Sequence, residues 1–380
     1  MSVIVTDAQY RPLLAVIRSL GRHDIGVTAS SPKKLAMSFF SKYCKQHFLY
    51  PNPEKKPHAF LNTLLSIVKK KKYDVLFSGS STMKLISRFR DKFTPYVRVP
   101  LAAHEKIMTA ENKWRVIKIA MEHGIPCPKT TLIRNPQEIK DISKKIEYPV
   151  VIKPQVGMGA KGVEYAHSPS EFVRKYKMVY SQYGPPLIQE YIPGTGYGVS
   201  ALFNKYSEPR AVFVHRRIRE NPITGGASTL RESVLNPEMK KLGLKLLKAL
   251  GWYGVAMVEF KLDSRDKKPK LMEINPRFWG SVQLAIASGV DFPYLLYKME
   301  VEGDVKPVNS YKVGVKCRHL FRDIGIARQY ILGSKNKLAR LFDFLKFFEP
   351  NLHYDVMSFR DPGPAFCELT NLIINTIAYS

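Results

Sequence analysis

The sequence predicts an α/β protein of more than one domain, in which a parallel sheet covered by helices comes first. Three observations support this prediction. The chain has 380 residues, more than one compact core usually holds. The first hundred residues alternate short apolar runs with helix-period segments, which is typical of βαβ units. Beyond residue 250, two apolar segments that each hold a carboxylate flank a short polar turn, which indicates two neighbouring strands.

The expected elements follow from the spacing of apolar residues and from Gly and Pro stop signals. In the first hundred residues we expect strands at 3–5, 26–28 and 74–77, and helices at 11–20 and 59–70. A helix over 110–124 follows a domain boundary near 100–110. Further strands are expected at 149–153, from 163 onward, and at 186–191, 198–203, 211–215, 254–262 and 269–274. Further helices are expected at 170–181, 237–250, 281–288, 293–301 and 328–348.

The net charge is +28, from 60 Lys and Arg against 32 Asp and Glu. Such a field attracts polyanions, which include nucleic acid, anionic lipid and phosphorylated substrates. Many of the lysines fall in helix-like stretches such as 69–72, however, so solvated basic faces are the favoured interpretation. The chain has no recognised RNA or DNA motif, and we expect no specific nucleic-acid partner.

The four cysteines, Cys44, Cys127, Cys317 and Cys367, lie far apart and form no CxxC pair. This spacing argues against a zinc site and against a dense disulfide framework. The first residues do not combine a basic stretch with a long apolar run, and no apolar stretch is long enough to span a bilayer. We therefore expect a cytoplasmic protein.

The segments VEF and MEINPR contain the strongest chemical signal. Glu273 and Asn275 are two residues apart, so on a strand they share a face, and Glu259 lies in the preceding strand. Three oxygen-bearing side chains of this kind suit a magnesium ion that bridges nucleotide phosphates. Arg277 follows, where its cation can hold a transferred phosphoryl group or an acyl phosphate. The alternative is that the two glutamates are exposed and pair with lysines.

A glycine-containing turn over 155–162 indicates a second site for phosphate. Lys153 ends a predicted strand just before Gly157, Gly159 and Gly162. Glycines let backbone N–H groups approach phosphate oxygens, and the lysine adds positive charge. A plain hairpin turn is the alternative. There is no GxGxxG after the first strand, so a dinucleotide site is not indicated.

The order of Lys113, Lys153, the glycine loop, QEYIPG, VEF and MEINPRFWGS resembles the ATP-grasp superfamily. This group includes biotin carboxylase, D-alanine ligase and the large subunit of carbamoyl-phosphate synthase, the last being nearest. The resemblance spans roughly residues 100–300. It implies an ATP-grasp fold of two α+β subdomains, 101–190 with a glycine lid and 191–310 with the metal site. A Rossmann-like α/β domain at 1–100 would precede them, and a basic helical extension at 311–380 would follow.

The resemblance also implies roles for individual residues. Glu259, Glu273 and Asn275 would hold Mg²⁺, with two ions expected and Mn²⁺ as a substitute. The ATP-binding residues would be Lys113, Lys153, Gly157, Gly159, Lys161, Gly162, Val163, Gln189, Glu190, Tyr191 and Ile192, the last four forming the hinge that meets adenine. The family commonly places a ribose-binding carboxylate shortly after the hinge, where this chain has Gly196.

The implied reaction converts a carboxylate and ATP into an acyl phosphate and ADP, after which an amine attacks. Amino acids or peptide-like molecules are the expected small-molecule substrates. Arg277 and Arg219 are the expected catalytic residues, with Arg219 on the same strand face as Arg217. The other expected substrate ligands are Arg216, Arg217, Gly225, Gly226 and Ser228. A solvated basic strand with a hairpin loop is the alternative.

The C-terminal segment, the oligomeric state and the presence of catalytic turnover each allow more than one interpretation. The segment 328–348 has apolar residues at helical spacing among basic ones, which favours a packed amphipathic helix, with contact to an anionic membrane surface as the alternative. A homodimer is a fair expectation for this resemblance. The alternative to a ligase is an ATP-binding regulatory or assembly protein without ligase turnover.

Overall fold

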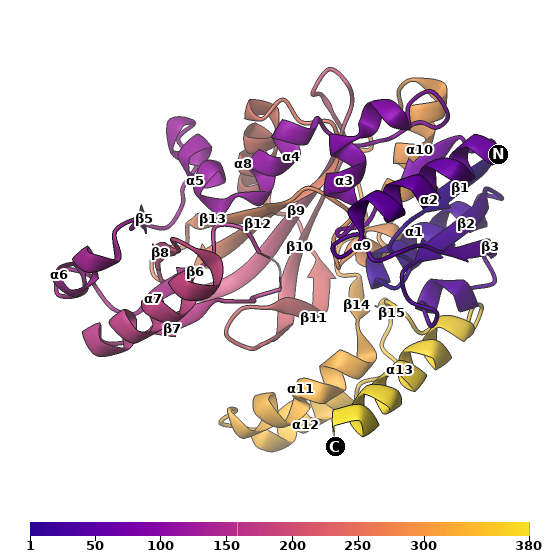
Figure 1. Cartoon of the computed structure of the whole chain (residues 1–380). Coiled ribbons are helices and arrows are strands. Elements are labelled where there is room, and N and C mark those ends of the chain that lie inside the picture. Colours follow the sequence, from indigo (N-terminus) through magenta and orange to yellow (C-terminus); the bar gives the residue numbers. More distant parts are fainter. Residues whose placement is uncertain (158, 380) are drawn as a thin grey trace.

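The computed structural model of the chain describes residues 1–157 and 159–379. Its described strands form three sheets (Figure 1). The first is wholly parallel, in the order β3-β2-β1-β4, and its strands are β1 (Ser2–Val5), β2 (Gly26–Ser31), β3 (Cys44–Leu49) and β4 (Val75–Phe77). Its helices are α1 (Arg11–Arg22), α2 (Pro57–Lys70) and α3 (Met83–Arg88). The Rossmann-like parallel sheet expected from the sequence is confirmed.

The second sheet is small and antiparallel, in the order β5-β8-β6-β7. Its strands are β5 (Thr130–Leu132), β6 (Val150–Lys153), β7 (Glu164–Ala166) and β8 (Leu187–Glu190), with helices α6 (Ile139–Ser143) and α7 (Pro169–Tyr183). A separate apolar cluster, which includes Ile152, Phe172 and Tyr176, holds α7 on this sheet. The hairpin predicted around the glycine turn is the β6–β7 pair.

The third sheet has seven strands in the order β13-β12-β9-β10-β11-β14-β15. The strands are β9 (Gly194–Phe203), β10 (Pro209–Asn221), β11 (Ala227–Ser233), β12 (Gly254–Asp263), β13 (Pro269–Asn275), β14 (Lys316–Arg318) and β15 (Leu352–Tyr354). Alternate residues enter two cores. Val199 and Val258 join the core that contains Met239 of α8 (Pro237–Ala249). Met257 joins the core that contains Val16 of α1.

Four further helices complete the packing around this sheet. They are α4 (His104–Glu111), α5 (Lys113–Glu122), α9 (Val282–Ala287) and α10 (Phe292–Glu302). The helix expected over 110–124 corresponds to α5, and only its first two expected residues belong to the end of α4. Asn112 divides the two helices, and its side chain accepts a hydrogen bond from the Arg115 backbone N–H at 3.0 Å. An asparagine cap of this kind starts a new helix.

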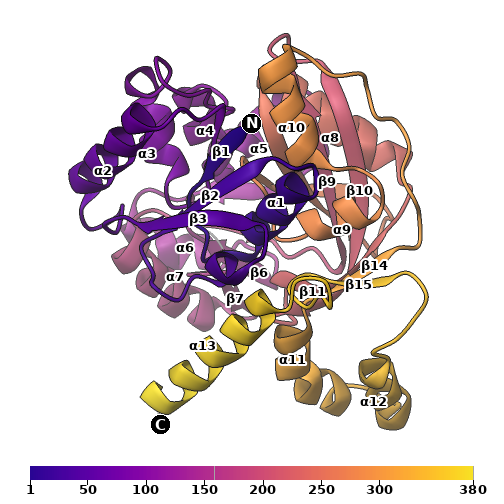
Figure 2. The ribbon, with the colours of Figure 1, turned by 90° about the vertical axis from the view of Figure 1, so that its right-hand side faces the viewer.

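The C-terminal residues differ most from expectation. Residues 311–380 were expected to be a helical extension, but β14 and β15 extend the large sheet. The helix expected over 328–348 is two helices, α11 (Leu320–Leu332) and α12 (Lys337–Leu345), because Gly333 follows the first and Asn336 caps the second. Together with α13 (Gly363–Tyr379), they lie at one end of the molecule (Figures 1 and 2). The four domain boundaries stay predictions.

Candidate active site

The two carboxylates of VEF and MEINPR face each other across paired strands. β12 and β13 run antiparallel, with Glu259 opposite Glu273 and Met257 opposite Asn275. Because facing residues share a side of the sheet, as do residues two apart, the three polar side chains project together. Asn275 Nδ2 donates to Glu259 Oε1 at 2.8 Å. The expected clustering on one face is confirmed.

Cationic side chains surround these carboxylates. Lys113 Nζ lies 3.1 Å from Glu273 Oε2, and Arg217 Nη2 contacts Glu259 Oε2. Burial, and second the ammonium of Lys113, lower the pKa of Lys153 to about 8. Burial alone would raise the pKa of Glu273, but Lys113 and Lys153 outweigh it, and this pKa lies below its usual value. The site therefore concentrates opposite charges within one buried region.

The oxygen donors match the preferences of a hard dication. Among residues 1–157 and 159–379, no cluster of three or more His, Cys, Asp or Glu residues could hold a metal. The third donor at this site is instead the Asn275 amide oxygen, which accepts from Arg277 Nη2 at 2.9 Å. Burial raises the pKa of Glu259, although Arg217 opposes the shift. The two carboxylates are partly buried, with side chains 15% and 28% exposed. A dication beside them and the Asn275 oxygen would favour the charged form of both glutamates, so the donor set fits Mg²⁺.

The base of the glycine loop is tied to the start of α5. The Lys113 backbone N–H donates to Gln155 O at 2.8 Å, and its Nζ donates to Gly157 O at 2.9 Å. Gly162 has a φ of 71°, and a Cβ there would lie 2.6 Å from the Tyr183 ring, so glycine is required. Gly159, Lys161 and Val163 complete the turn into β7, whereas Met158 lies outside the described residues.

The hinge expected at 189–192 lies at the end of β8. Gln189 is buried and donates from Nε2 to Thr130 Oγ1 at 2.9 Å, and Glu190 Oε1 lies 2.5 Å from Arg265 Nη2. Lys261 Nζ donates to Ile192 O at 3.1 Å and lies over the Tyr191 ring. The sequence analysis did not identify Lys261 as a site residue. Its position two residues after Glu259 on the same strand indicates that both side chains share a face, and this signal could have identified it.

Glu220 is a second residue that sequence reasoning missed. A side chain beginning at Gly196 would meet Glu220 Oε1 at 3.0 Å and Arg217 Cδ at 2.8 Å. The Glu220 carboxylate, which comes from another strand, thus lies close to where a side chain at position 196 would begin. Glu220 Oε1 accepts from Arg217 Nη1 at 3.0 Å. No local sequence signal pairs residues 196 and 220, because β9 and β10 bring them together.

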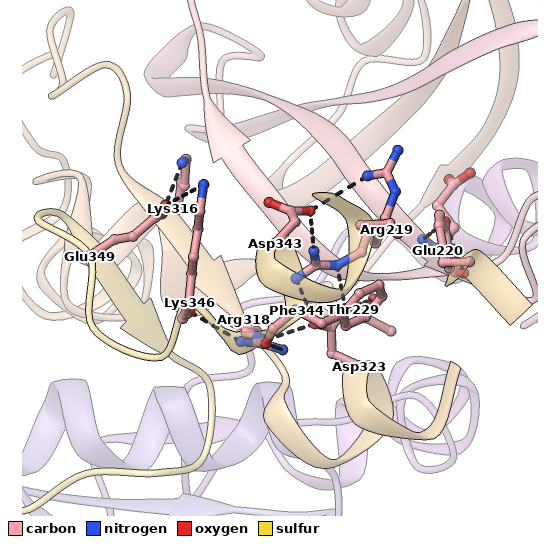
Figure 3. A network of polar contacts seen from close by, with 12 residues as sticks. Arg219, Glu220, Thr229, Lys316, Arg318, Asp323, Asp343, Phe344, Lys346 and Glu349 are labelled. Atoms are coloured by element: carbon pink, nitrogen blue, oxygen red, sulfur yellow. Dashed lines mark hydrogen bonds and ion pairs between the residues drawn. The ribbon is translucent and has the colours of Figure 1, made fainter. Parts of the chain in front are cut away.

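The prediction that Arg219 shares a face with Arg217 is wrong. The register of β10 on β11 shifts between Arg217 and Arg219, and again between Arg219 and Glu220. Such a bulge re-aims the side chains that follow it. Arg219 is 1% exposed and donates to Asp323 through Nε at 2.9 Å and Nη2 at 2.7 Å (Figure 3). Its Nη1 donates to Asp343 at 2.8 Å. Its guanidinium is thus occupied by internal carboxylates, which contradicts the expected role of Arg219 as a catalytic residue and substrate ligand.

The other expected substrate residues separate into two groups. Arg217 Nη1 donates to Gly226 O at 3.0 Å, and its Nη2 contacts Glu259, so Arg217 links the 225–228 loop, with Gly225 and Ser228, to the face that carries Glu259. β7 contacts the same loop, because the Tyr165 hydroxyl donates to Thr224 O at 2.9 Å. Arg216 pairs with Glu232, its Nη2 lying 2.9 Å from Oε2. Both residues line a pocket of about 350 Å³ that Arg217 and Lys316 also line, so Arg217 links the two groups.

The comparisons with known proteins agree with this geometry. A family model described as ATP-grasp domain matches residues 110–281. This segment is an ATP-grasp domain. The N-terminal section of the carbamoyl phosphate synthase large chain of Methanopyrus kandleri is 25% identical over 195 residues, which are 48% of this chain and 34% of that protein. The match therefore spans about a third of that relative's length.

Solved structures extend the likeness beyond the ATP-grasp domain. A biotin carboxylase from Campylobacter jejuni, in a complex with β,γ-ATP, has a TM-score of 0.69 at 16% identity, and the match covers 83% of this chain and 74% of that one. The biotin carboxylase domain of a Hydrogenobacter thermophilus 2-oxoglutarate carboxylase, with MgADP and bicarbonate, has a TM-score of 0.66 at 18% identity, covering 83% and 73%. At these identities the likeness establishes the fold.

Proposed function

We propose that the chain is an ATP- and Mg²⁺-dependent ligase that activates a carboxylate as an acyl phosphate for attack by an amine, with an amino acid or peptide-like substrate. The main support is the Glu259, Glu273 and Asn275 face with Lys113 and Lys153 beside it, on an ATP-grasp domain. A metal–triphosphate complex carries both positive and negative charge. Oxygen donors and ammonium groups side by side therefore suit it better than a cluster of carboxylates alone or of lysines alone would.

In this proposal each part of the site contacts a different part of ATP. Lys113 and Lys153 contact the phosphates, and the lid residues Gly157, Gly159, Lys161, Gly162 and Val163 cover them. Gln189, Glu190, Tyr191 and Ile192 border adenine. Glu220 binds the ribose hydroxyls in place of a carboxylate at 196, because its Oε1 lies 3.0 Å from that position.

The metal would be held by Glu259, Glu273 and Asn275, as two Mg²⁺ ions or with Mn²⁺ as a substitute. A bound ion would supply positive charge that offsets the charge of the phosphates, and these three residues would hold it. Arg217 contacts Glu259, and Arg277 donates to Asn275, so both guanidinium groups lie beside the donor set. From there they can hold a substrate carboxylate and the phosphoryl group being transferred, in geometries that a guanidinium fork favours.

The reaction proceeds by positioning rather than through a covalent enzyme intermediate. A substrate carboxylate oxygen forms a bond to the γ-phosphorus while the bond to the bridging oxygen of ADP breaks. The amine then attacks the acyl carbon, phosphate leaves, and the amine gives up a proton. Cations on the enzyme offset the charge that develops on the oxygens in both steps.

The test is ADP release with pairs of amino acids, followed by mass spectrometry of the products. We expect release only when a carboxylic acid and an amine are both present, and loss of release in Glu273→Gln. Glu122→Gln, at an exposed position at the end of α5, is the matched control and should retain activity. Release that is unchanged in Glu273→Gln would contradict the site.

A non-enzymatic ATP-binding role is the competing outcome of the same experiment. It would appear as thermal stabilisation by a non-hydrolysable ATP analogue together with no turnover on the whole substrate panel. The lack of a carboxylate at Gly196 favours this alternative, but the nearby Glu220 weakens that support.

A further inference from the structure

The helix α12 turns its apolar stripe away from the body of the protein. Leu338, Leu341, Phe342 and Leu345 stand at i, i+3, i+4 and i+7, which places them on one helix face, and all four are exposed. Phe344, on the other side, is buried against the Arg219 guanidinium at 4.1 Å. A surface helix usually packs its apolar stripe on the core, so this helix lacks that partner within the described chain.

Other large apolar side chains are exposed in the same C-terminal region. Phe348 is 89% exposed, Phe359 is 96% exposed, and Phe366 at the start of α13 is 68% exposed. Figures 1 and 2 both place α11, α12 and α13 at the same end of the molecule, below the large sheet. Exposed apolar side chains gathered at one end of the molecule are typical of an interaction site.

Acidic side chains in this region pair with basic ones. Asp323, Asp355 and Asp361 are buried, and each pairs with an arginine. Asp343 pairs with Arg219, and Glu349 pairs with Lys316. The sixth acid, Glu368 on α13, contacts His319 Nε2 at 2.7 Å. The basic partners of the other five offset most of the acidic charge, so these acids contribute little to the charge of the outer surface.

Basic side chains in the same region face outward. The exposed ones are Arg322, Arg328, Lys335, Lys337, Lys346 and Arg360. The outer surface of this end is therefore apolar and cationic at once. Anionic lipid complements both properties, because cations contact the headgroups while the apolar stripe enters the boundary with the acyl chains.

We propose that the α11–α13 end docks on the surface of an anionic lipid bilayer, with α12 lying in the interface. The contact is peripheral, since no described helix is long and apolar enough to cross a membrane. A second copy of the chain is a poorer occupant. A symmetric dimer through this surface would place its exposed cations against the same cations of the partner.

The test is co-sedimentation of the full chain with vesicles of phosphatidylcholine containing about a third phosphatidylglycerol, compared with pure phosphatidylcholine. We expect at least about tenfold stronger partition into the anionic vesicles, and a decrease as salt is raised from low to physiological ionic strength. Failure to bind anionic vesicles, or equal binding to both kinds, would overturn the proposal.

Two pairs of variants separate the apolar and the cationic contributions. Phe342→Ser with Phe348→Ser should reduce partition at least about tenfold, whereas Tyr206→Ser with Leu235→Ser, at positions 69% and 70% exposed on other surfaces, should not. Thermal melting checks that all four substitutions leave the fold intact. Equal losses in both pairs would mean that vesicle binding does not depend on this end, which contradicts the proposal.

The charge pair uses the same design. Lys335→Glu with Lys337→Glu should weaken binding at least about tenfold, while Lys144→Glu with Lys145→Glu makes the same change of net charge far along the chain and should have a small effect. All four lysines are exposed. Sedimentation velocity without lipid detects the competing occupant. A dimer that Phe342→Ser with Phe348→Ser abolishes, together with no vesicle binding, would assign the surface to a second copy.

Discussion

Asn275 donates a hydrogen bond from Nδ2 to Glu259 Oε1 at 2.8 Å, across two paired strands, while its own Oδ1 accepts from Arg277 at 2.9 Å. The Asn275 amide thus orients the partly buried Glu259 carboxylate and holds its own oxygen, Oδ1, beside that carboxylate. The bond to Glu259 depends on the antiparallel register that sets Met257 opposite Asn275, whereas the bond from Arg277 is local. In the proposed function, this one side chain is both a metal ligand and a support for another ligand.

Asn275→Ala should reduce ADP release by about a hundredfold or more, because it removes an oxygen donor and the hydrogen bond to Glu259. Asn275→Asp should retain more activity than Asn275→Ala, since it keeps an oxygen at this position. The measurement is the rate of ADP release as Mg²⁺ is titrated, and the Ala variant should require more Mg²⁺. Equal Mg²⁺ dependence in the wild-type protein and Asn275→Ala would contradict the proposed metal site.

Glu220→Gln should raise the KM for ATP by about tenfold, because a neutral amide accepts weaker hydrogen bonds from ribose hydroxyls than a carboxylate does. The wild-type protein should also prefer ATP to 2′-deoxy-ATP, and the variant should lose part of that preference. Glu232→Gln, which removes the partner of Arg216, is the control. An unchanged preference between the two nucleotides in Glu220→Gln would remove Glu220 from the ribose site.

Arg219→Met should lower the free energy of unfolding by about 3–5 kcal/mol, because it leaves the buried Asp323 without one of its cations. Arg216→Met, in which the lost arginine side chain is 49% exposed, should cost less than about 1 kcal/mol. Urea denaturation compares the two variants. If Arg219→Met does not fold, Arg219→Lys should fold and be intermediate. A stable Arg219→Met with a raised substrate KM would restore Arg219 as a ligand.

Glu300 should make the protein less stable as pH rises. Burial raises the pKa of Glu300 to about 7, although Arg98 and Arg90 oppose the shift, and the Tyr253 hydroxyl donates to its Oε1. Between the unfolded value near 4.5 and the folded value, the folded chain binds more protons, so the free energy of unfolding falls as pH rises through this window. The contribution is on the order of 3 kcal/mol.

Urea unfolding of Glu300→Gln between pH 5 and 8 measures this contribution. The variant should show a flatter pH dependence than the wild-type protein and should be the more stable of the two at pH 8. Glu302→Gln, an exposed position on the same helix, should keep the wild-type slope. A wild-type slope in Glu300→Gln would show that Glu300 is charged in the folded protein throughout this range.

Much of this protein follows from its sequence alone. Apolar periodicity with Gly and Pro stop signals predicted the parallel N-terminal sheet and helices such as α1 and α8, because these elements depend on local pattern. The spacing of Glu273 and Asn275 predicted their common face, since residues two apart on a strand point the same way. The resemblance then predicted an ATP-grasp domain, which the family model confirms for residues 110–281.

The tertiary structure decided features that depend on contacts between distant residues. A shift of register in β10 sent Arg219 into a buried network with Asp323, against the alternation expected of a regular strand. The pairing of β9 with β10 placed Glu220 beside Gly196. The direction of the α12 stripe was equally unreadable, because periodicity identifies an apolar face but only packing determines whether that face meets the core or the outside.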